Sequence, residues 1–271
     1  MSSTTTFRDL TVPTRDGVGI PFDLHIPAEP SGPLPLVIYL HGGGWLRGSR
    51  VDAEAARQLP VVESGVALAS VDYRLSGEGT WPLQLEDVED AIAGIPAVAA
   101  EQGVELSGRI ALWGASAGGH LALMAAFAAA ERGERGPDAV AAWFPATDLT
   151  LMSDAPKSPN ARLPHFMAPG TVPPPFERLL LGLEDGVDGT EQLQAASPLH
   201  RAAAGAAPVL LVHGDEDALI PHHHSLVLRD ALVGKGVDVT LITVRGATHE
   251  DPALDTPAIL GATAAHLRGR P

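Results

Sequence analysis

The chain alternates between short, continuous apolar runs and longer stretches with helical periodicity. Apolar runs of this length are typical of strands buried on both faces, as in parallel sheets covered by helices. Their repetition predicts β-α-β units, and therefore an α/β fold with a mainly parallel sheet of about eight strands and helices on both faces. Strands are expected at residues 36–40, 66–71, 109–113, 139–144, 209–212 and 239–244. Helices are expected at 52–64, 82–101, 118–132, 225–234 and 257–267.

Two segments depart from this alternation. Near the N-terminus, two weakly alternating stretches, 10–13 and 22–26, predict a hairpin around Arg15-Asp16-Gly17. Residues 145–208 are rich in proline and contain one clearly helical stretch, 176–183. A connection of this length is unusual inside a compact domain. We therefore expect a single domain, residues 1–271, with a small cap inserted at about 145–208.

Composition and charge narrow the classes of partner. Hydrophobic residues make up 45% of the chain, which is enough for a sizeable core. Eighteen Lys and Arg against 33 Asp and Glu give a formal net charge of −15. Because an acidic surface repels phosphate backbones and anionic lipid headgroups, no nucleic-acid or membrane partner is expected. A homo-oligomer remains compatible with the sequence.

The chain contains no cysteine, which excludes disulfides, thiolate catalysis and cysteine-based zinc sites. No apolar run approaches the roughly 18 residues of a membrane span. The polar first residues, 1–9, are unlike a secretory signal. We expect a soluble, cytoplasmic protein.

The strongest local pattern is Gly114-Ala115-Ser116-Ala117-Gly118, a G-x-S-x-G between an expected strand and an expected helix. A sharp strand-to-helix turn strains the backbone of its central serine, so the flanking residues must be small. The turn exposes the hydroxyl, and the following helix N-terminus favours negative charge beside it. This arrangement is the nucleophile elbow of serine hydrolases, and it makes Ser116 the candidate nucleophile.

A second motif, His41-Gly42-Gly43-Gly44-Trp45, follows the strand at 36–40. Consecutive glycines leave backbone N–H groups free to point at a ligand oxygen. We expect Gly43, Gly44 and Ala117 to donate hydrogen bonds to an oxyanion. A phosphate-binding loop is the alternative, but neither its lysine nor a G-x-G-x-x-G spacing is present.

A serine nucleophile needs a base, and the base needs an orienting acid. His249 follows the last expected strand, at the sheet edge where Ser116 also emerges. Asp217 follows the strand before it and is our choice for the acid, with Asp215 as the alternative. Asp215 stands directly at the strand end, where a carboxylate more often caps its own loop.

The other histidines are expected to have different roles. His222-His223-His224 resembles a metal site only superficially, because three consecutive side chains cannot easily face one ion. We expect no metal there. His41 and His120 are expected to be structural, whereas His165 in the cap is a candidate contact to substrate.

Three stretches together resemble a known family, the α/β-hydrolases related to bacterial feruloyl esterases. They are residues 41–45, Val71-Asp72-Tyr73-Arg74-Leu75 and residues 114–122. This group is similar to hormone-sensitive-lipase-like esterases and to kynurenine formamidases. Lipase-like relatives usually carry Asp at the position of Ala115, so the resemblance favours the feruloyl-esterase-like branch. It implies a carboxylic ester hydrolase without a cofactor, with Ser116, Asp217 and His249 as its triad. Residues 72–75 would support the oxyanion loop from behind.

A small-molecule ester of small to medium size, without charge, is the expected substrate. Several apolar or aromatic residues and one histidine are expected to line its pocket: Trp45, Leu46, Tyr73, His165, Phe166, Phe176 and Leu180. Two alternatives stay open. The same residues would serve an amide hydrolase of the arylformamidase or peptidase type. A non-catalytic α/β-hydrolase that binds a small ligand is the other.

Overall fold

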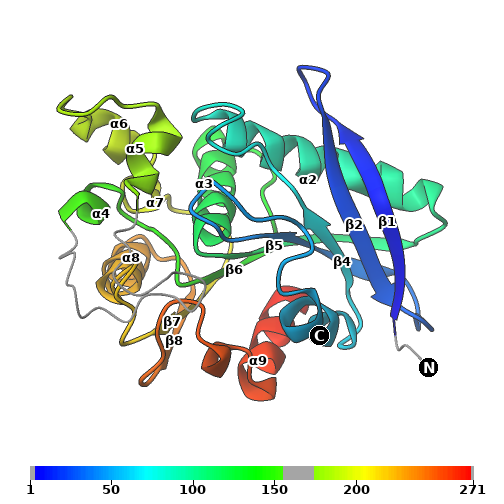
Figure 1. Cartoon of the computed structure of the whole chain (residues 1–271). Coiled ribbons are helices and arrows are strands. Elements are labelled where there is room, and N and C mark those ends of the chain that lie inside the picture. The colour runs from blue at the N-terminus through cyan, green and yellow to red at the C-terminus, as the bar shows by residue number, and fades with distance from the viewer. Residues whose placement is uncertain (1–3, 155–173, 270–271) are drawn as a thin grey trace.

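An eight-stranded sheet runs through the centre of the computed structural model, which describes residues 4–154 and 174–269 (Figure 1). Its strand order is β1-β2-β4-β3-β5-β6-β7-β8. The strands are β1 (Thr4–Pro13), β2 (Gly19–Pro27), β3 (Leu34–Leu40), β4 (Ala67–Val71), β5 (Leu106–Ala115), β6 (Ala139–Trp143), β7 (Val209–Gly214) and β8 (Val239–Val244). Only the pairings of β2 with β1 and β4 are antiparallel. This is the strand order of an α/β-hydrolase, and the prediction of a mainly parallel sheet of about eight strands is confirmed.

Side chains of the central strands enter two separate cores, one on each face of the sheet. On β3, Leu36, Ile38 and Leu40 belong to the first core, and Val37 and Tyr39 belong to the second. Because both faces are buried, every position on such a strand favours an apolar side chain. The continuous apolar runs in the sequence have this cause.

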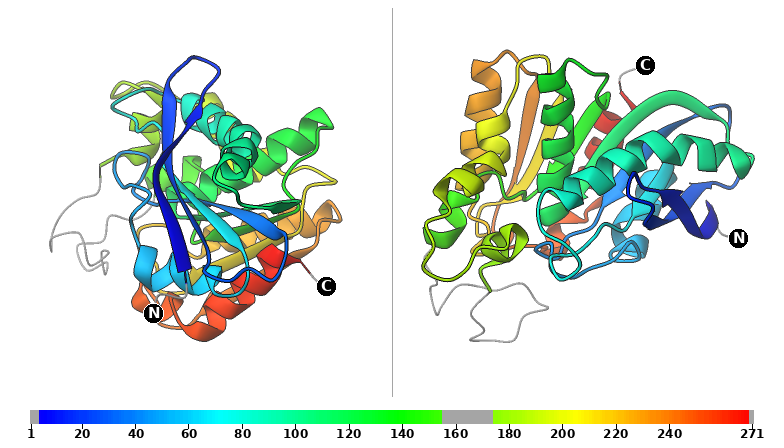
Figure 2. Two further views of the ribbon diagram at one scale, coloured as in Figure 1. Left: turned by 90° about the vertical axis from the view of Figure 1, so that its right-hand side faces the viewer. Right: turned by 90° about the horizontal axis from the view of Figure 1, so that it is seen from above.

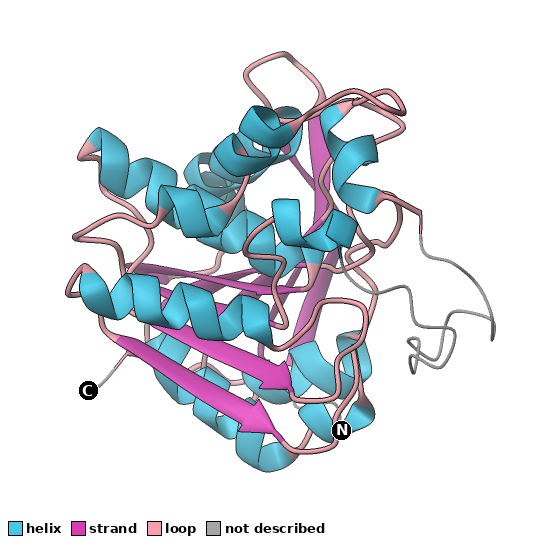
Figure 3. Cartoon of the chain, turned by 90° about the vertical axis from the view of Figure 1, so that its left-hand side faces the viewer, coloured by secondary structure: helices cyan, strands magenta, loops and turns pink. Residues whose placement is uncertain are grey.

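Helices cover both faces, as expected (Figures 2 and 3). The first core lies under α2 (Leu83–Glu101), α3 (Ala117–Arg132) and α8 (His223–Gly234). The second lies under α1 (Leu59–Val62) and α9 (Pro257–Arg268). Of the helices in residues 4–154 and 174–269, none has both the length and the apolar character of a membrane span.

The expected helix at 52–64 is shorter and less regular than its sequence suggested. A π-helical turn, η1 (Glu54–Gln58), leads directly into the four-residue α1. The N-terminal hairpin, in contrast, is longer than expected, because β1 and β2 extend over ten and nine residues. Most side chains of β1 are not buried, so its outer residues carry no hydrophobic pattern from which the strand could be predicted.

The segment expected to form a cap carries four short helices in its described part. They are α4 (Thr150–Asp154), α5 (Phe176–Leu181), α6 (Thr190–Ala195) and α7 (Pro198–Arg201), and they lie together beside α3 and α8 (Figure 1). Leu199 of α7 donates a backbone hydrogen bond to Thr147, just beyond β6. The end of this segment is therefore anchored to the main body. A 3-10 turn, η2 (Pro252–Leu254), precedes α9.

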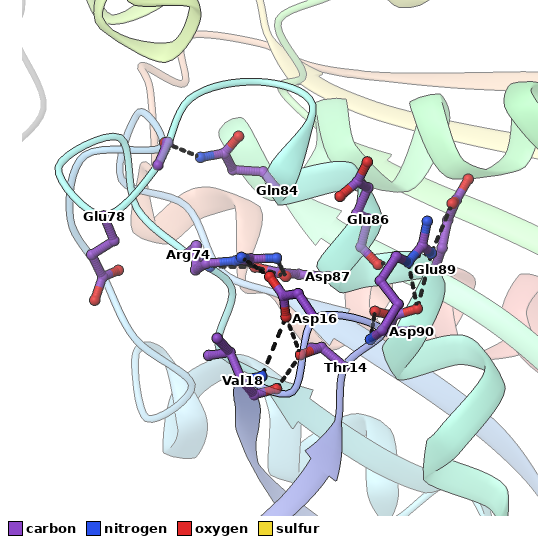
Figure 4. Close-up of polar contacts among 12 residues, drawn as sticks. Thr14, Asp16, Val18, Arg74, Glu78, Gln84, Glu86, Asp87, Glu89 and Asp90 are labelled. Atoms are coloured by element: carbon purple, nitrogen blue, oxygen red, sulfur yellow. Dashed lines mark hydrogen bonds and ion pairs between the residues drawn. The ribbon is translucent and has the colours of Figure 1, made fainter.

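A buried ion pair joins the segment after β4 to α2 (Figure 4). The carboxylate of Asp87, which is fully buried, accepts hydrogen bonds from the backbone N–H of Arg74 and from its guanidinium. The same guanidinium donates to Asp16 in the hairpin turn, and Asp16 also accepts from Thr14. Three segments that are distant in sequence are thus held together at one point, next to Tyr73.

We expect Asp87→Ala to lower the free energy of unfolding by about 2–3 kcal/mol, because it leaves the Arg74 guanidinium partly buried without its main partner. Urea denaturation measures the change. Asp230→Ala is the matched control, because its ion pair with Arg229 is exposed and should contribute less than about 0.5 kcal/mol. Equal losses in the two variants would contradict the prediction.

Candidate active site

Ser116 occupies a sharp turn between β5 and α3, with φ 55° and ψ −116°. This is a strained conformation for a residue with a side chain, and such strain is typical of functional sites. The two glycines of the motif make the turn possible. A Cβ on Gly118 would lie 2.0 Å from the carbonyl oxygen of Leu40, and one on Gly114 would lie 2.2 Å from the backbone of Gly118. Only glycine fits at either position.

The structure brings three residues from separate loops together at the carboxyl end of the sheet. His249 Nε2 lies 2.9 Å from Ser116 Oγ, and His249 Nδ1 lies 2.6 Å from Asp217 Oδ2. Since an ionised carboxylate only accepts, Nδ1 carries the proton, and Nε2 is free to accept from the serine hydroxyl. All three residues are buried, with 5%, 2% and 6% exposure for Ser116, His249 and Asp217.

The carboxylate of Asp217 accepts four hydrogen bonds. Oδ1 accepts from the backbone N–H groups of Leu219 and Ile220, each at 2.9 Å. Oδ2 accepts from His249 and, at 3.2 Å, from Nε2 of His213. Burial alone would raise the pKa of this carboxyl, but the nearby histidines and these bonds outweigh it and hold the pKa well below its usual value. Asp217 therefore stays ionised beside His249.

The alternative acid, Asp215, has a different role in the structure. Its Oδ1 accepts from the backbone N–H of Gly246 at 2.6 Å, so it ties the loop after β7 to the loop after β8. It has no bond to His249 within the described residues. Of the two candidates, the structure places Asp217 against the imidazole.

Opposing influences act on the imidazole of His249. Burial lowers its pKa, because a buried cation loses its hydration. The charge of Asp217 and the hydrogen bond to it raise the pKa, and Glu250 adds to this effect. The net result is a pKa above the usual value of 6.5. The ring of Phe144 packs edge-on against the imidazole, with 4.7 Å between centroids, and helps to fix its orientation.

The glycine loop after β3 curves around Ser116. Gly43 and Gly44 have φ of 119° and 64°, a region that strongly favours glycine. A Cβ on Gly44 would also lie 2.4 Å from the ring of Phe176. In the described part of the chain, the N–H groups of Gly43, Gly44 and Ala117 donate to no protein acceptor. Three backbone N–H groups without a protein acceptor thus lie around the serine, as an oxyanion would require.

A cavity opens directly above Ser116 and His249. Gly43, Gly44 and Ala117 form part of its wall. Of the predicted pocket residues, Trp45 and Phe176 line it. Sequence reasoning missed the other lining side chains, which are Arg47, Met152, Leu219, Ile220 and Glu250.

Three predicted pocket residues lie elsewhere, and their assignment to this cavity is corrected. Tyr73 is buried behind the glycine loop, where its hydroxyl donates to the carbonyl of His41 and its ring stacks on that histidine at 4.3 Å. Leu46 is 37% exposed, and Leu180 is fully buried in the first core. His165 and Phe166 fall outside the described residues.

His213 is a contributor that the sequence analysis did not single out. Its Nε2 bonds Asp217 and the carbonyl of Ile220, and its Nδ1 lies 2.7 Å from the hydroxyl of Ser225. The ring therefore braces the acid at Oδ2, the same oxygen that accepts from His249. Its place at the end of β7 could have identified it from the sequence, because site residues in α/β folds lie at the carboxyl ends of the strands.

Comparisons with known proteins identify the family. The model of the family described as BD-FAE matches residues 22–232, which include the glycine loop, Ser116 and Asp217. The chain belongs to the BD-FAE family. The match ends before His249.

Several curated relatives are named as esterases. Esterase LipC of Mycobacterium tuberculosis is 30% identical over 237 residues, which cover 83% of this chain and 55% of the relative. A probable isoprenylcysteine alpha-carbonyl methylesterase of Oryza sativa is 27% identical, with 87% and 56% covered. This BD-FAE chain thus spans about half the length of these relatives.

Among solved structures, an esterase of Pyrobaculum calidifontis superposes with a TM-score of 0.79 at 26% identity, covering 97% of this chain and 84% of that one. A bacterial heroin esterase superposes with a TM-score of 0.76, also at 26% identity, covering 98% and 84%. Both likenesses extend over almost the whole chain and show the α/β-hydrolase fold of carboxylesterases.

We expect Asp217→Asn to lower the pKa of His249 from above 6.5 to below it, because the burial that opposes the imidazolium remains while the stabilising charge is lost. NMR titration of the imidazole ring measures the pKa. Asp215→Asn is the control on the same loop and should leave it nearly unchanged. An unchanged His249 pKa in Asp217→Asn would show that the carboxylate does not govern this imidazole.

Proposed function

We propose that this BD-FAE protein hydrolyses carboxylic esters through a covalent acyl-enzyme, with Ser116, His249 and Asp217 as its catalytic triad. The observation that carries the proposal is the 2.9 Å contact between His249 Nε2 and Ser116 Oγ, beside three unoccupied backbone amides. The esterase names of the relatives support it. The small-molecule partner, the cytoplasmic location and self-association stay predictions from the sequence.

In the first half-reaction, Ser116 Oγ attacks the ester carbonyl carbon as its proton passes to His249 Nε2. The carbonyl oxygen gains the negative charge and accepts from the backbone N–H groups of Gly43, Gly44 and Ala117, which stabilise it. Asp217 holds the imidazole in the required tautomer and stabilises the imidazolium. The tetrahedral intermediate then collapses, the carbon–oxygen bond to the alcohol breaks, and His249 donates its proton to the leaving oxygen.

In the second half-reaction, His249 removes a proton from water, which attacks the acyl carbon. The same amides bind the second oxyanion. The bond to Ser116 breaks, the serine takes its proton back from His249, and the carboxylic acid leaves. The apolar side chains of Trp45 and Phe176 in the cavity wall suit a small to medium acyl or alcohol part.

Ser116→Ala should abolish covalent labelling by a fluorophosphonate and lower kcat for p-nitrophenyl esters by about 10⁴-fold or more, because no nucleophile remains. Asp217→Asn should lower kcat by a similar factor through the wrong imidazole tautomer. Asp215→Asn is the matched control and should stay within severalfold of the wild type. Mass spectrometry of the adduct and initial rates are the measurements.

Two results would contradict the proposal. Absence of an adduct on Ser116 in the folded wild type would favour a non-catalytic protein that binds a small ligand. Faster turnover of an amide than of its isosteric ester, in a panel with acetate, butyrate, decanoate and feruloyl esters, would favour the amide hydrolase.

We expect kcat/KM to fall about tenfold per pH unit on the acidic side, because a protonated His249 cannot accept the serine proton. Since the pKa of this imidazole is raised, the decline should begin at a pH above 6.5. A pH–rate profile with a neutral ester measures it. A plateau that persists down to pH 6 would contradict a base of raised pKa.

A further inference from the structure

The carboxylate of Glu250 lies beside the nucleophile. Glu250 follows His249 in sequence and lines the cavity above Ser116. The position that a Cβ of Gly42 would occupy is 2.8 Å from Glu250 Oε1 and 3.5 Å from Cβ of Ser116. A negative side chain is therefore present within the site itself, next to the start of the glycine loop.

The backbone of Glu250 is in the left-handed region, with φ 54°. This conformation is uncommon for a residue with a long side chain, and it persists only where the surroundings impose it. Here it turns the side chain of Glu250 toward Gly42, while His249 points toward Ser116. The two neighbours thus reach the same small volume.

The carboxylate has no donor in the described part of the protein. Within residues 4–154 and 174–269, it takes part in no hydrogen bond and no ion pair. Arg47, the other charged residue of the cavity wall, has an interaction of its own. Pocket carboxylates are usually paired or used to orient a ligand, and Glu250 has no such pairing here.

A carboxylate at this point opposes the negative charge of the oxyanion, although it also stabilises the imidazolium that His249 forms. The carbonyl oxygen of the ester becomes negative in the transition state, and a second negative charge nearby disfavours that change. A cationic group on the substrate would offset the carboxylate. The net charge of −15 would also attract such a substrate over longer distances.

We propose that Glu250 makes this site selective for esters whose alcohol part carries a cationic group, such as a quaternary ammonium. The inference rests on the proposed ester hydrolysis and names its substrate class. The alcohol part is the relevant one because His249, the neighbour of Glu250, delivers the proton to the leaving alcohol oxygen. The alcohol therefore leaves on the side of the site where Glu250 lies. Glu250 acts as a specificity-determining residue, and the proton transfers of the reaction remain with His249.

The test compares acetylcholine, the acetate ester of choline, with its neutral isostere, 3,3-dimethylbutyl acetate. In the isostere a carbon replaces the ammonium nitrogen. The kcat/KM of each ester is measured at low ionic strength from the rate at which acetic acid is released. The two values are then compared as a ratio. In the wild type the cationic ester should be favoured by about tenfold, as expected for one partly solvated charge pair. In Glu250→Gln the ratio should fall toward one. Glu101→Gln removes the same charge at the exposed end of α2 and should keep the wild-type ratio.

Three outcomes would overturn the inference. A wild-type ratio near one, with the neutral ester still hydrolysed, removes the selectivity and leaves the proposed function intact. An equal slowing of both esters in Glu250→Gln would show that the residue acts only through His249. Failure to hydrolyse any ester, with no fluorophosphonate adduct on Ser116, would overturn both proposals.

Discussion

The close approach of α3 to the end of β3 is the constraint on which the site depends. The missing side chain of Gly118 lets the helix backbone come within van der Waals distance of the Leu40 carbonyl. Without this approach, the strained turn at Ser116 could not place its hydroxyl beside the loop that starts at His41. The nucleophile and the unoccupied amides therefore share one geometric cause. Gly114 and Gly118 act through close packing, because a Cβ at either position would collide with neighbouring backbone.

Electrostatics then organises the remainder of the site around one buried carboxylate. Asp217 is surrounded by donors from its own loop, from His213 and from His249. Because its oxygens are fully bonded, the cost of burying the charge is offset, and the charge acts mainly on the imidazole. Glu250 contrasts with it, since the described protein provides no partner for the second carboxylate of the cavity. One acid is held for the imidazole, and the other faces the cavity.

Much of this arrangement could be predicted from the sequence, because it follows from local rules. Buried strands such as β3 are apolar at every position, and the G-x-S-x-G between a strand and a helix has a steric reason. The choice of Asp217 over Asp215 followed from reach, since a carboxylate at the strand end bonds its own neighbourhood. Chain order and the shared edge of a parallel sheet brought His249 into the same prediction.

The pocket could not be predicted in the same way, because it depends on tertiary packing. Tyr73 and Leu180 are as apolar as Phe176, yet the fold buries them behind the loop or in the core. Nothing in the local sequence distinguishes Glu250 from any other loop glutamate, because its orientation comes from a positive φ angle. His213 likewise acquires its role only when the loop after β7 folds back over it.

The position of β8 in the sheet has a consequence for how heating would separate His249 from Ser116. β8 is the terminal strand and pairs with β7 alone, whereas β5, which leads into Ser116, is enclosed by β3 and β6. His249 thus follows an edge strand that is paired on one side, whereas Ser116 follows a strand that is paired on both sides. Edge elements open more readily than central ones. Fraying of β8 on warming would move His249 away from Ser116 while most of the sheet stays intact.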